Sequence, residues 1–321
     1  MNIKTVNDRS LDEAAEILKK GGVVAFPTET VYGLGADALN PSAAAKIFEV
    51  KQRPLSDPLI VHISRPDMIE YAAENIPQAA ERLMERFWPG PLTFVLRKKS
   101  SLPDIVTSGL DSVAVRMPAH VAALNLIEKA GTPIAAPSAN LFGRLSPTTA
   151  AHVHEQLGEK IDLILDGGTC SVGVESTILK VEGNRFLILR PGGIPLNEIE
   201  EIAGCKLITL PDSGEAPGSF PSHYAPVSRL IIVENIDRKL AWESGAAFLF
   251  YRKPDFLYDA SRSAVLSEKG DIREAAVNLF SSLHRLDAMK PECIYTETVP
   301  EKGLGVAVMD RLRKASRRRP G

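Results

Sequence analysis

Polar side chains that could hold a small molecule follow the first apolar run of this sequence. Residues 27–35, Pro-Thr-Glu-Thr-Val-Tyr-Gly-Leu-Gly, combine hydroxyls, a carboxylate and a phenol with glycines that permit tight turns. The preceding run 23–26 is apolar and ends at Pro27, so it predicts a buried strand with Thr30 in the loop at its end. Such a loop can grip a polar ligand. It can equally be a plain connection whose Thr and Glu side chains cap turns.

Two cations follow where a predicted helix ends. Lys51 and Arg53 are separated by one residue, and Asp57 comes four residues after Arg53. A lysine beside the planar fork of an arginine can hold a triphosphate. The same cations would complement the negative end of the helix dipole, and on these residues alone that explanation is the stronger one.

A histidine and an arginine mark two further apolar runs. His62 interrupts the run 59–63, where its imidazole could accept a proton from a substrate amine or hydrogen-bond to a hydroxyl. Arg116 ends the run 113–116, where it could bind an anion. A lone histidine is more often structural, and a surface salt bridge is the ordinary explanation for such an arginine.

Small polar residues border three more runs. Ser138 follows the run 133–136, Ser176 opens another, and Arg190 closes a third ahead of a glycine pair. Ser146 precedes a proline at the predicted start of a helix, where free backbone amides favour anions. Each could serve only in a turn. Because α/β proteins bind ligands beyond strand ends, their shared placement predicts a site for an anionic small molecule.

The elements that would position these residues alternate along the chain. Apolar residues at helical spacing predict a helix over 8–20, and Asn40 with Pro41 begins another that runs to about Lys51 before Pro54. Strands are predicted at 23–26, 59–63, 92–96, 113–116, 133–136, 163–165, 176–181 and 186–189. Helices between them predict one α/β domain with a mixed sheet up to about residue 205.

A segment rich in Pro, Gly and Ser then divides the chain. Residues 211–228 read PDSGEAPGSFPSHYAPVS, a composition typical of a linker. Strands predicted at 230–233, 246–250 and 293–295, with helices over 271–286 and from 305, indicate a small α/β module. The expected organisation is a first domain at 1–210, a linker at 211–227 and a C-terminal domain at 228–321.

Composition narrows the class of protein. The 321 residues are 44% apolar, which predicts a fully folded chain of two domains. Since 38 Lys plus Arg nearly balance 40 Asp plus Glu, no overall positive field would draw the chain to nucleic acid or membrane. The three cysteines lie far apart, which argues against a disulfide framework or zinc site, and no apolar run approaches a membrane span. We expect a cytoplasmic protein.

Seven motifs follow one another along the chain: PTETVYGLG at 27–35, KQRP with DPL at 51–59, WPGPLT at 88–93, VAVRMP at 113–118, APSAN at 136–140, ESTI at 175–178 and LRPGG at 189–193. In this order they resemble one known family, the YrdC-like threonylcarbamoyl-AMP synthases in their longer, two-domain form. They cover the first domain throughout. The segment SHYAP at 222–226 and the α/β tail resemble the extension of the two-domain subgroup.

The resemblance implies a YrdC-like domain with a twisted mixed sheet and flanking helices, followed by a small Rossmann-like domain. It implies that L-threonine, bicarbonate or carbon dioxide, and ATP are joined into threonylcarbamoyl-AMP with release of pyrophosphate. The product would serve the N6-threonylcarbamoyladenosine modification of tRNA next to the anticodon, through a downstream tRNA threonylcarbamoyl transferase complex. Direct tRNA binding is left open.

The resemblance also assigns residues. Threonine would be held by Thr30, His62, Arg116, the backbone of Ala136, and Ser176. ATP would meet Arg53, Asp57, Ser112, Ser138, Ser146, Arg190 and Tyr224. Lys51 and Arg53 would act in catalysis near the phosphates, and Mg²⁺ would arrive with ATP rather than on protein ligands. The linker carrying Tyr224 would close over the nucleotide as a lid.

Two other functions would require sequence features that differ from those present. An RNA-binding module without catalysis would present a basic concave surface, which the near-neutral charge disfavours. A carbamoyltransferase-type nucleotide enzyme, as in hydrogenase maturation, would carry paired CxxC zinc motifs that this sequence lacks.

Overall fold

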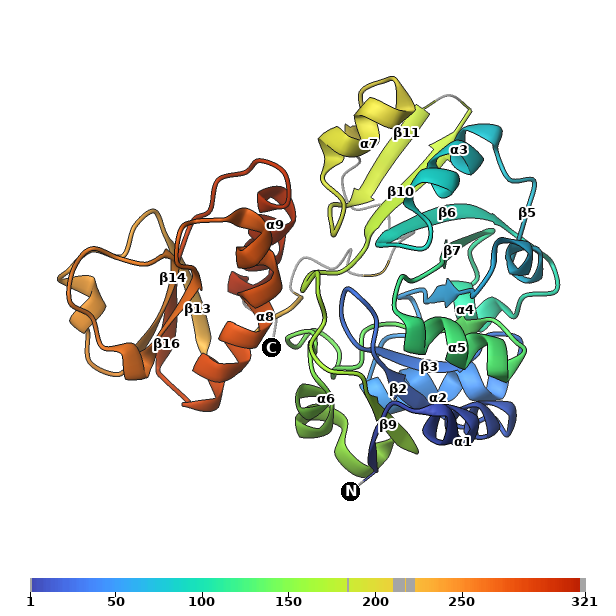
Figure 1. Cartoon of the computed structure of the whole chain (residues 1–321), viewed down its shortest axis with the longest axis horizontal. Helices are drawn as coiled ribbons and strands as arrows, with labels where there is room; N and C mark the ends of the chain where they lie inside the picture. The colour runs from blue at the N-terminus through green and yellow to red at the C-terminus, as the bar shows by residue number, and fades with distance from the viewer. Residues whose placement is uncertain (1, 184, 210–216, 218–222, 318–321) are drawn as a thin grey trace.

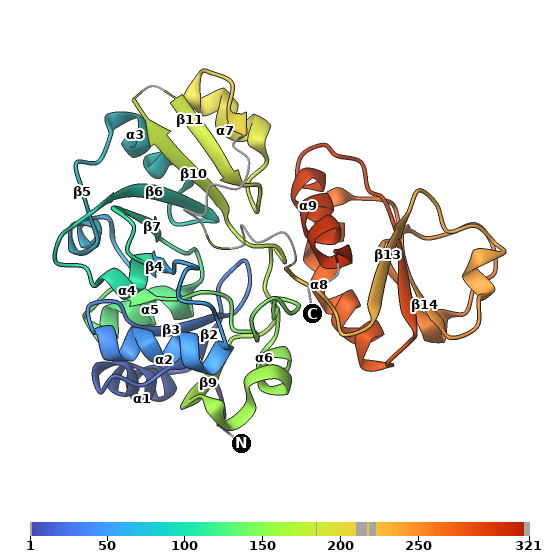
Figure 2. The same cartoon turned by 180° about the vertical axis from the view of Figure 1, so that it is seen from behind.

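The computed structural model describes residues 2–183, 185–209, 217 and 223–317. These residues form two sheets, each with its own helices, and Figures 1 and 2 show them as two lobes with the second lobe's helices facing the first. The strands of the first sheet are β1 Ile3–Thr5, β2 Val24–Phe26, β3 Gly33–Asp37, β4 Ile60–His62, β5 Ala73–Glu74, β6 Leu92–Lys98, β7 Ser112–Arg116, β8 Ile134–Ala135, β9 Leu163–Asp166, β10 Thr177–Glu182, β11 Arg185–Arg190 and β12 Ile208–Thr209.

The first sheet is mixed, as predicted. Its order is β1-β9-β2-β3-β8-β4-β7-β6-β10-β11-β12, with β5 paired to β6. β4 and β7 run parallel, whereas β6 and β7 run antiparallel. The accompanying helices are α1 Asp8–Lys19, α2 Pro41–Lys51, α3 Gln78–Phe87, α4 Asp104–Thr107, α5 Val121–Ala130, α6 Ala150–Leu157 and α7 Leu196–Ala203, with 3₁₀ turns at Pro66–Tyr71 and Gly158–Lys160.

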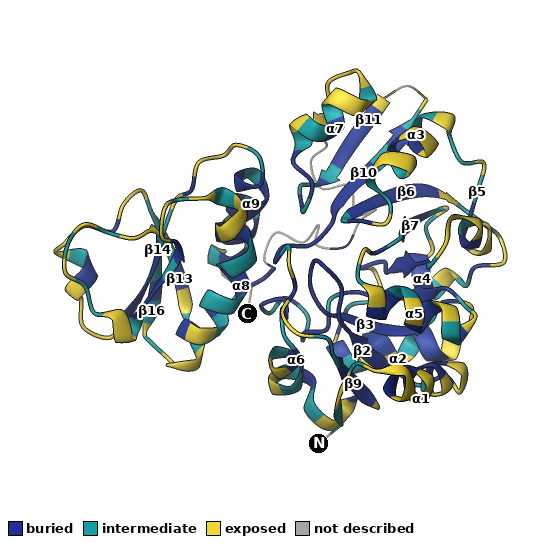
Figure 3. Ribbon diagram, in the orientation of Figure 1, coloured by how far each residue is buried: buried dark blue, intermediate teal, exposed yellow. Residues whose placement is uncertain are grey.

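Alternation along the central strands separates two faces of this sheet. Val61, Phe94 and Val115 belong to the main apolar core, while their neighbours Ile60 and Ala114 belong to a smaller cluster on the opposite face. Figure 3 shows the strands buried and the outward helix surfaces exposed. His62 and Arg116 lie two residues after Ile60 and Ala114 on the same strands, so their side chains share the face of this smaller cluster.

Local signals placed the early helices correctly. The Asn40 side chain accepts hydrogen bonds from the backbone N–H groups of Ser42 and Ala43 at the start of α2, with Pro41 in the first turn. The helix then ends at Lys51, and Gln52 adopts a left-handed conformation with φ 53°. Lys51 and Arg53 thus lie at a helix exit, as predicted.

Two local predictions were wrong. Residues 33–35 do not continue the loop of the first motif, because Gly33–Asp37 forms β3, which pairs with β2. The helix predicted to start at Ser146 starts instead at Ala150, where the Thr149 hydroxyl accepts a hydrogen bond from the backbone N–H of His152. Two Ser/Thr caps competed within four residues, and the later one begins the helix.

The second sheet is small and parallel. Its strands are β13 Arg229–Val233, β14 Ala246–Arg252, β15 Ser263–Ser267 and β16 Cys293–Glu297, in the order β13-β16-β14-β15. The helices are α8 Ile272–Ala288 and α9 Gly305–Ser316, with 3₁₀ turns at Leu240–Trp242 and Ala260–Arg262. All of its strand pairs are parallel, which is the arrangement of a small Rossmann-like domain.

The predicted linker is described only in part. Residues 210–216 and 218–222 lie outside the described residues, whereas Pro217 and 223–227 are placed. The domain boundaries at 210 and 227 therefore stay a prediction. In the part of the chain that the structure describes, no helix has both the length and the apolar character that crossing a membrane requires.

Candidate active site

The pairing of β4, β7 and β6 brings polar side chains into one row across the sheet. His62 pairs with Arg116, and Arg116 pairs with Thr93 of β6. Paired residues on neighbouring strands point to the same face, which here is the face of Ile60 and Ala114. Ser176 lies next to Thr93 at the end of this row, since the two hydroxyl oxygens are 2.7 Å apart.

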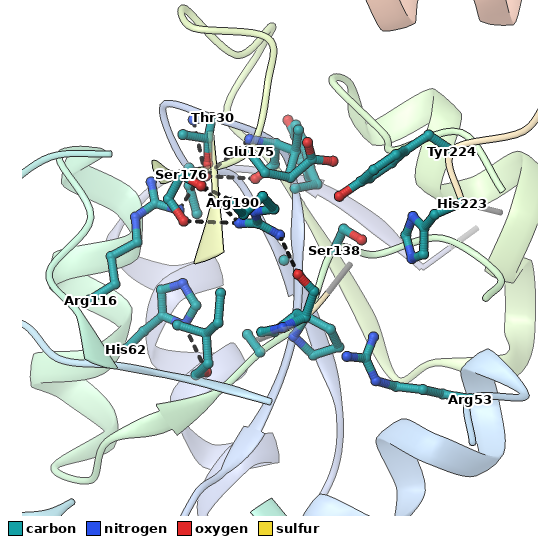
Figure 4. Close-up of a pocket in the computed structure, with 18 residues that line it drawn as sticks. Thr30, Arg53, His62, Arg116, Ser138, Glu175, Ser176, Arg190, His223 and Tyr224 are labelled. Atoms are coloured by element: carbon teal, nitrogen blue, oxygen red, sulfur yellow. Dashed lines mark hydrogen bonds between the residues drawn. The ribbon is translucent and has the colours of Figure 1, made fainter. Parts of the chain in front are cut away.

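Most of the predicted site residues line a single pocket above this row. Those that line it are Thr30, Arg53, His62, Arg116, Ala136, Ser138, Ser176, Arg190 and Tyr224. Figure 4 shows Arg116 and His62 on one side, Tyr224, His223 and Arg53 on the other, and Arg190 and Ser138 between them. The cavity volume is only about 40 Å³. A space of this size accommodates waters but not a nucleotide.

Three predicted residues lie directly behind the pocket wall. Lys51 Nζ donates hydrogen bonds to the carbonyl oxygens of Ser138 and Asn140 at 2.5 Å each. Asp57 pairs with Arg53 at 2.8 Å, and the Ser146 hydroxyl donates a hydrogen bond to a Glu175 carboxylate oxygen. These residues can position the pocket residues that they touch.

Ser112 is separated from all of these. It begins β7, whereas Arg116 ends that strand, which places the two Cα atoms about 13 Å apart at the rise of an extended strand. Ser112 pairs with Arg97 and lines a different cavity. The structure thus does not bring Ser112 to the pocket, because Ser112 and Arg116 stand at opposite ends of β7 and only the Arg116 end reaches the pocket.

Arg116 is held by buried partners on three sides. One Nη atom lies 2.6 Å from a Glu29 carboxylate oxygen, the other donates to the Thr30 hydroxyl at 2.9 Å, and Nε donates to the Gly90 carbonyl oxygen at 3.2 Å. Arg116 is 4% exposed, so the ordinary explanation of a surface salt bridge is wrong. Its guanidinium is preorganised in the middle of the row, between His62 and Thr93.

A second buried arginine, Arg190, lies beside Ser176. It donates hydrogen bonds to the Ser176 carbonyl oxygen from Nε at 3.2 Å and from one Nη at 3.0 Å. The other Nη donates to the Pro217 carbonyl oxygen at 3.1 Å. The Pro217 carbonyl oxygen thus accepts a hydrogen bond from a guanidinium group that lines the pocket, and Pro217 itself lines the same pocket.

Burial shifts the pKa values of Lys51 and Tyr224. Burial, and then the nearby charge of Arg53, hold the pKa of Lys51 well below its usual range. Burial likewise raises the pKa of the Tyr224 phenol to about 12, so this group stays a hydrogen-bond donor at neutral pH.

His62 is neutral in the folded protein. Burial, and then the charge of Arg116, lower its pKa to about 3. Its Nδ1–H donates to the Ile60 carbonyl oxygen at 3.2 Å. A neutral imidazole can hydrogen-bond to a substrate without adding charge beside Arg116.

The low pKa of His62 predicts a loss of stability in acid. Because the unfolded chain takes up this proton below pH 6.5 and the folded chain does so only near pH 3, stability falls as pH decreases between those values. We expect His62→Gln to remove about 2 kcal/mol of the decline in unfolding free energy between pH 7 and 5. Urea unfolding of both proteins at the two pH values measures this, and parallel declines would contradict it.

Several residues of this site carried no specific signal in the sequence. Glu29 neutralises Arg116, and Glu175 lines the pocket while pairing at 2.7 Å with Arg311 of the C-terminal domain. His223 lies edge-on to Tyr224, with ring centroids 4.1 Å apart. Motif membership could have pointed to Glu29 and Glu175, and His223 belongs with Tyr224 to the linker predicted to act as a lid, but nothing in the sequence indicates Arg311. Within the described residues no His, Cys, Asp or Glu side chains group as a metal site.

Comparison with known proteins agrees with this architecture. The Sua5/YciO/YrdC family model, described as "Telomere recombination", matches residues 16–192, and the model "Threonylcarbamoyl-AMP synthase, C-terminal domain" matches residues 194–317. The threonylcarbamoyl-AMP synthase of Pyrococcus abyssi is 47% identical, with 94% of this chain and 93% of that protein covered. The synthase of Bacillus subtilis is 41% identical, with 97% and 94% covered.

A solved structure gives the same result in three dimensions. The crystal structure of P. abyssi Sua5 complexed with L-threonine superposes with a TM-score of 0.91 at 44% identity and covers 98% of each chain. The YrdC-like first domain and the small second domain predicted from the motifs are both confirmed. The chain belongs to the Sua5/YrdC family of threonylcarbamoyl-AMP synthases, in its two-domain form.

Proposed function

We propose that the pocket binds L-threonine beside ATP and joins them with bicarbonate or carbon dioxide into threonylcarbamoyl-AMP, with release of pyrophosphate. The observation that carries the proposal is the pocket's division into two halves. One half holds Arg116 and His62, the other holds Arg53 and Tyr224, and Ser138 lies between them. Family membership and the threonine complex of the P. abyssi protein support the assignment.

Threonine belongs in the half that contains the sheet row. Arg116 would bind its carboxylate, and the Thr30 hydroxyl lies within hydrogen-bond reach of the same guanidinium. The neutral His62 would meet the hydroxyl or amine. Ser176 and the backbone of Ala136 complete this half.

ATP belongs in the other half. Arg53 and Arg190 supply charge for the phosphates, with Ser138 and Tyr224 as hydrogen-bonding groups. Lys51, Asp57 and Ser146 would act from behind the wall, through Ser138, Arg53 and Glu175. We leave Ser112 out of the ATP assignment. Mg²⁺ would enter as the ATP complex and share the neutralisation of the triphosphate.

The chemistry needs no protein nucleophile. The threonine amine combines with carbon dioxide to form a carbamate, or with bicarbonate to form the same carbamate and water. A carbamate oxygen then attacks the α-phosphorus of ATP, and the bond to the β-phosphate oxygen breaks to release pyrophosphate. Positioning and charge neutralisation carry the rate, which fits a pocket lined by arginines and hydroxyls.

Ligand entry requires the closed pocket to open. Pro217 and Tyr224 both line a space too small for a nucleotide, so these two residues must shift when ATP binds. This supports the proposed lid. The adenylate would pass to a tRNA threonylcarbamoyl transferase complex in the cytoplasm, and the lid would shield it from water until release.

Pyrophosphate release should require threonine and bicarbonate together. The carbamate, not the amino-acid carboxylate, is the attacking group, so omission of bicarbonate from degassed buffer should stop the reaction. Serine should react about 10- to 200-fold less efficiently, because it lacks the methyl that fills the pocket. Coupled pyrophosphate assays with each component omitted in turn test both points. Bicarbonate-independent release would instead indicate an aminoacyl-adenylate and would overturn the proposal.

A further inference from the structure

The C-terminal domain packs directly on the loops that form the pocket. Val31, Leu145 and Val174 belong to the same apolar cluster as Leu279 and Phe280 of α8. Gly173 approaches α8 so closely that a Cβ atom there would lie 2.4 Å from the Val277 Cα. Figures 1 and 2 both show α8 and α9 between the small sheet and the first domain.

One α9 residue, Arg311, reaches the pocket wall. Its Nε donates to Glu175 at 2.7 Å, and one Nη donates to the Pro191 carbonyl oxygen at 3.0 Å. The guanidinium also lies 5.0 Å from the centre of the Tyr224 ring. Arg311 is 1% exposed, so these contacts are shielded from solvent. A single side chain of the C-terminal domain thus touches both a wall residue and the lid tyrosine.

Ser146 contacts the C-terminal domain directly through His284 and indirectly through Glu175. Its hydroxyl donates to the Glu175 carboxylate that pairs with Arg311, and its carbonyl oxygen accepts a hydrogen bond from His284 Nε2 of α8 at 3.1 Å. The His284 ring also stacks on His152 at 3.9 Å between centroids. By contrast, the described hydrogen bonds of Thr30, His62 and Arg116 are all made within the first domain.

We propose that Arg311 is a positioning residue for the nucleotide half of the active site, so that docking of the C-terminal domain and ATP binding are coupled. The inference rests on the proposed assignment of ATP to that half. Arg311 acts through Glu175 and Tyr224 and does not itself line the pocket.

The physical basis is charge balance and fixed geometry. Glu175 lines the pocket as a buried carboxylate, and the triphosphate would bring further negative charge into the same space. Arg311 neutralises Glu175, which leaves Arg190 available for phosphate. Without Arg311, Glu175 would repel the nucleotide and attract Arg190, and Tyr224 would lose the cation on its ring. Threonine binding should change little, because the described hydrogen bonds of Thr30, His62 and Arg116 include neither Glu175 nor Arg190.

The test compares binding of two ligands to the full-length chain. Calorimetry with α,β-methylene-ATP and, separately, with threonine should show that Arg311→Met weakens the nucleotide about 5- to 150-fold, the usual range of coupling between sites, and threonine less than about twofold. Arg313→Met is the matched control, because Arg313 lies on the same helix in an exposed pair with Glu301, and it should leave both affinities unchanged. Circular dichroism and thermal unfolding establish that each variant folds.

A second substitution keeps the inference testable if the buried change unfolds the protein. In Glu175→Gln/Arg311→Met the buried carboxylate is removed together with its partner, and Asp310, which also pairs with Arg311 at 2.6 Å, keeps Lys314 at 3.2 Å. Folding should therefore be regained, and nucleotide binding should recover most of its loss. Equal weakening of both ligands, or unaltered nucleotide binding by a folded Arg311→Met, would overturn the inference. If the unaltered protein bound no nucleotide at all, the proposed function itself would fail instead.

Discussion

Replacing Arg116 with alanine should lower threonine-dependent pyrophosphate release on the order of 100- to 1,000-fold. The guanidinium is the only described cation on the threonine side of the pocket, and its removal leaves the buried Glu29 carboxylate to repel the threonine carboxylate. Binding of α,β-methylene-ATP should change little. Calorimetry with each ligand separates the two effects, and Arg116→Lys, which keeps the charge but loses the fork, should retain part of the threonine affinity.

Arg53→Ala should show the opposite selectivity. Arg53 pairs with Asp57 at 2.8 Å in the nucleotide half, so its loss should weaken the ATP analogue and spare threonine. Arg97→Ala is a suitable control, because Arg97 is an exposed arginine of the same sheet, paired with Glu74. If Arg116→Ala weakened the nucleotide and left threonine binding intact, the two halves would have to be exchanged.

Loss of the Tyr224 ring should reduce turnover on the order of 100-fold while the first domain stays folded. The ring packs against His223, Phe280 and Arg311, so Tyr224→Ala removes packing from the domain interface as well as a wall of the pocket. Pyrophosphate release and thermal unfolding of the variant measure the two consequences. A passive tether would tolerate the substitution.

Tyr224→Phe separates the hydroxyl from the ring. The Tyr224 hydroxyl is buried without a hydrogen-bond partner among the described residues, so its removal should leave thermal stability equal or higher. Turnover should nevertheless fall about tenfold, because the bound nucleotide would lose its hydrogen bond to this hydroxyl. Tyr251→Phe is the reverse control, since Tyr251 donates to the Gly270 carbonyl oxygen away from the pocket. It should lose stability and keep activity.

Much of the fold followed from local chemistry. Asn40 and Pro41 start α2 because an Asn side chain can satisfy free amides and proline has none to satisfy. Apolar runs at 59–63 and 113–116 became β4 and β7 because continuous apolar segments must be buried on both faces. Seven of the nine predicted residues that line the pocket lie in or within four residues of a buried strand, whereas Arg53 and Tyr224 do not.

At two positions the local sequence did not determine the structure, and tertiary contacts did. Ser146 and Thr149 can both cap a helix, but Thr149 caps α6, whereas the Ser146 hydroxyl donates a hydrogen bond to Glu175. Ser112 directly precedes the motif that contains Arg116, but it lies at the opposite end of β7. Residues that are close in the sequence of a motif can therefore lie far apart in the structure, because the site forms only where particular strand ends lie side by side.

Only long-range packing brought the remaining parts of the site together. The pairing of β4 with β7 placed His62 beside Arg116, and this burial, with the charge of Arg116, lowered the pKa of the imidazole. Arg311 meets Glu175 across 136 positions of sequence. No periodicity or cap relates residues so far apart. Their contact follows from the docking of one folded domain on another, which depends on the shape and charge of surfaces that exist only after each domain has folded.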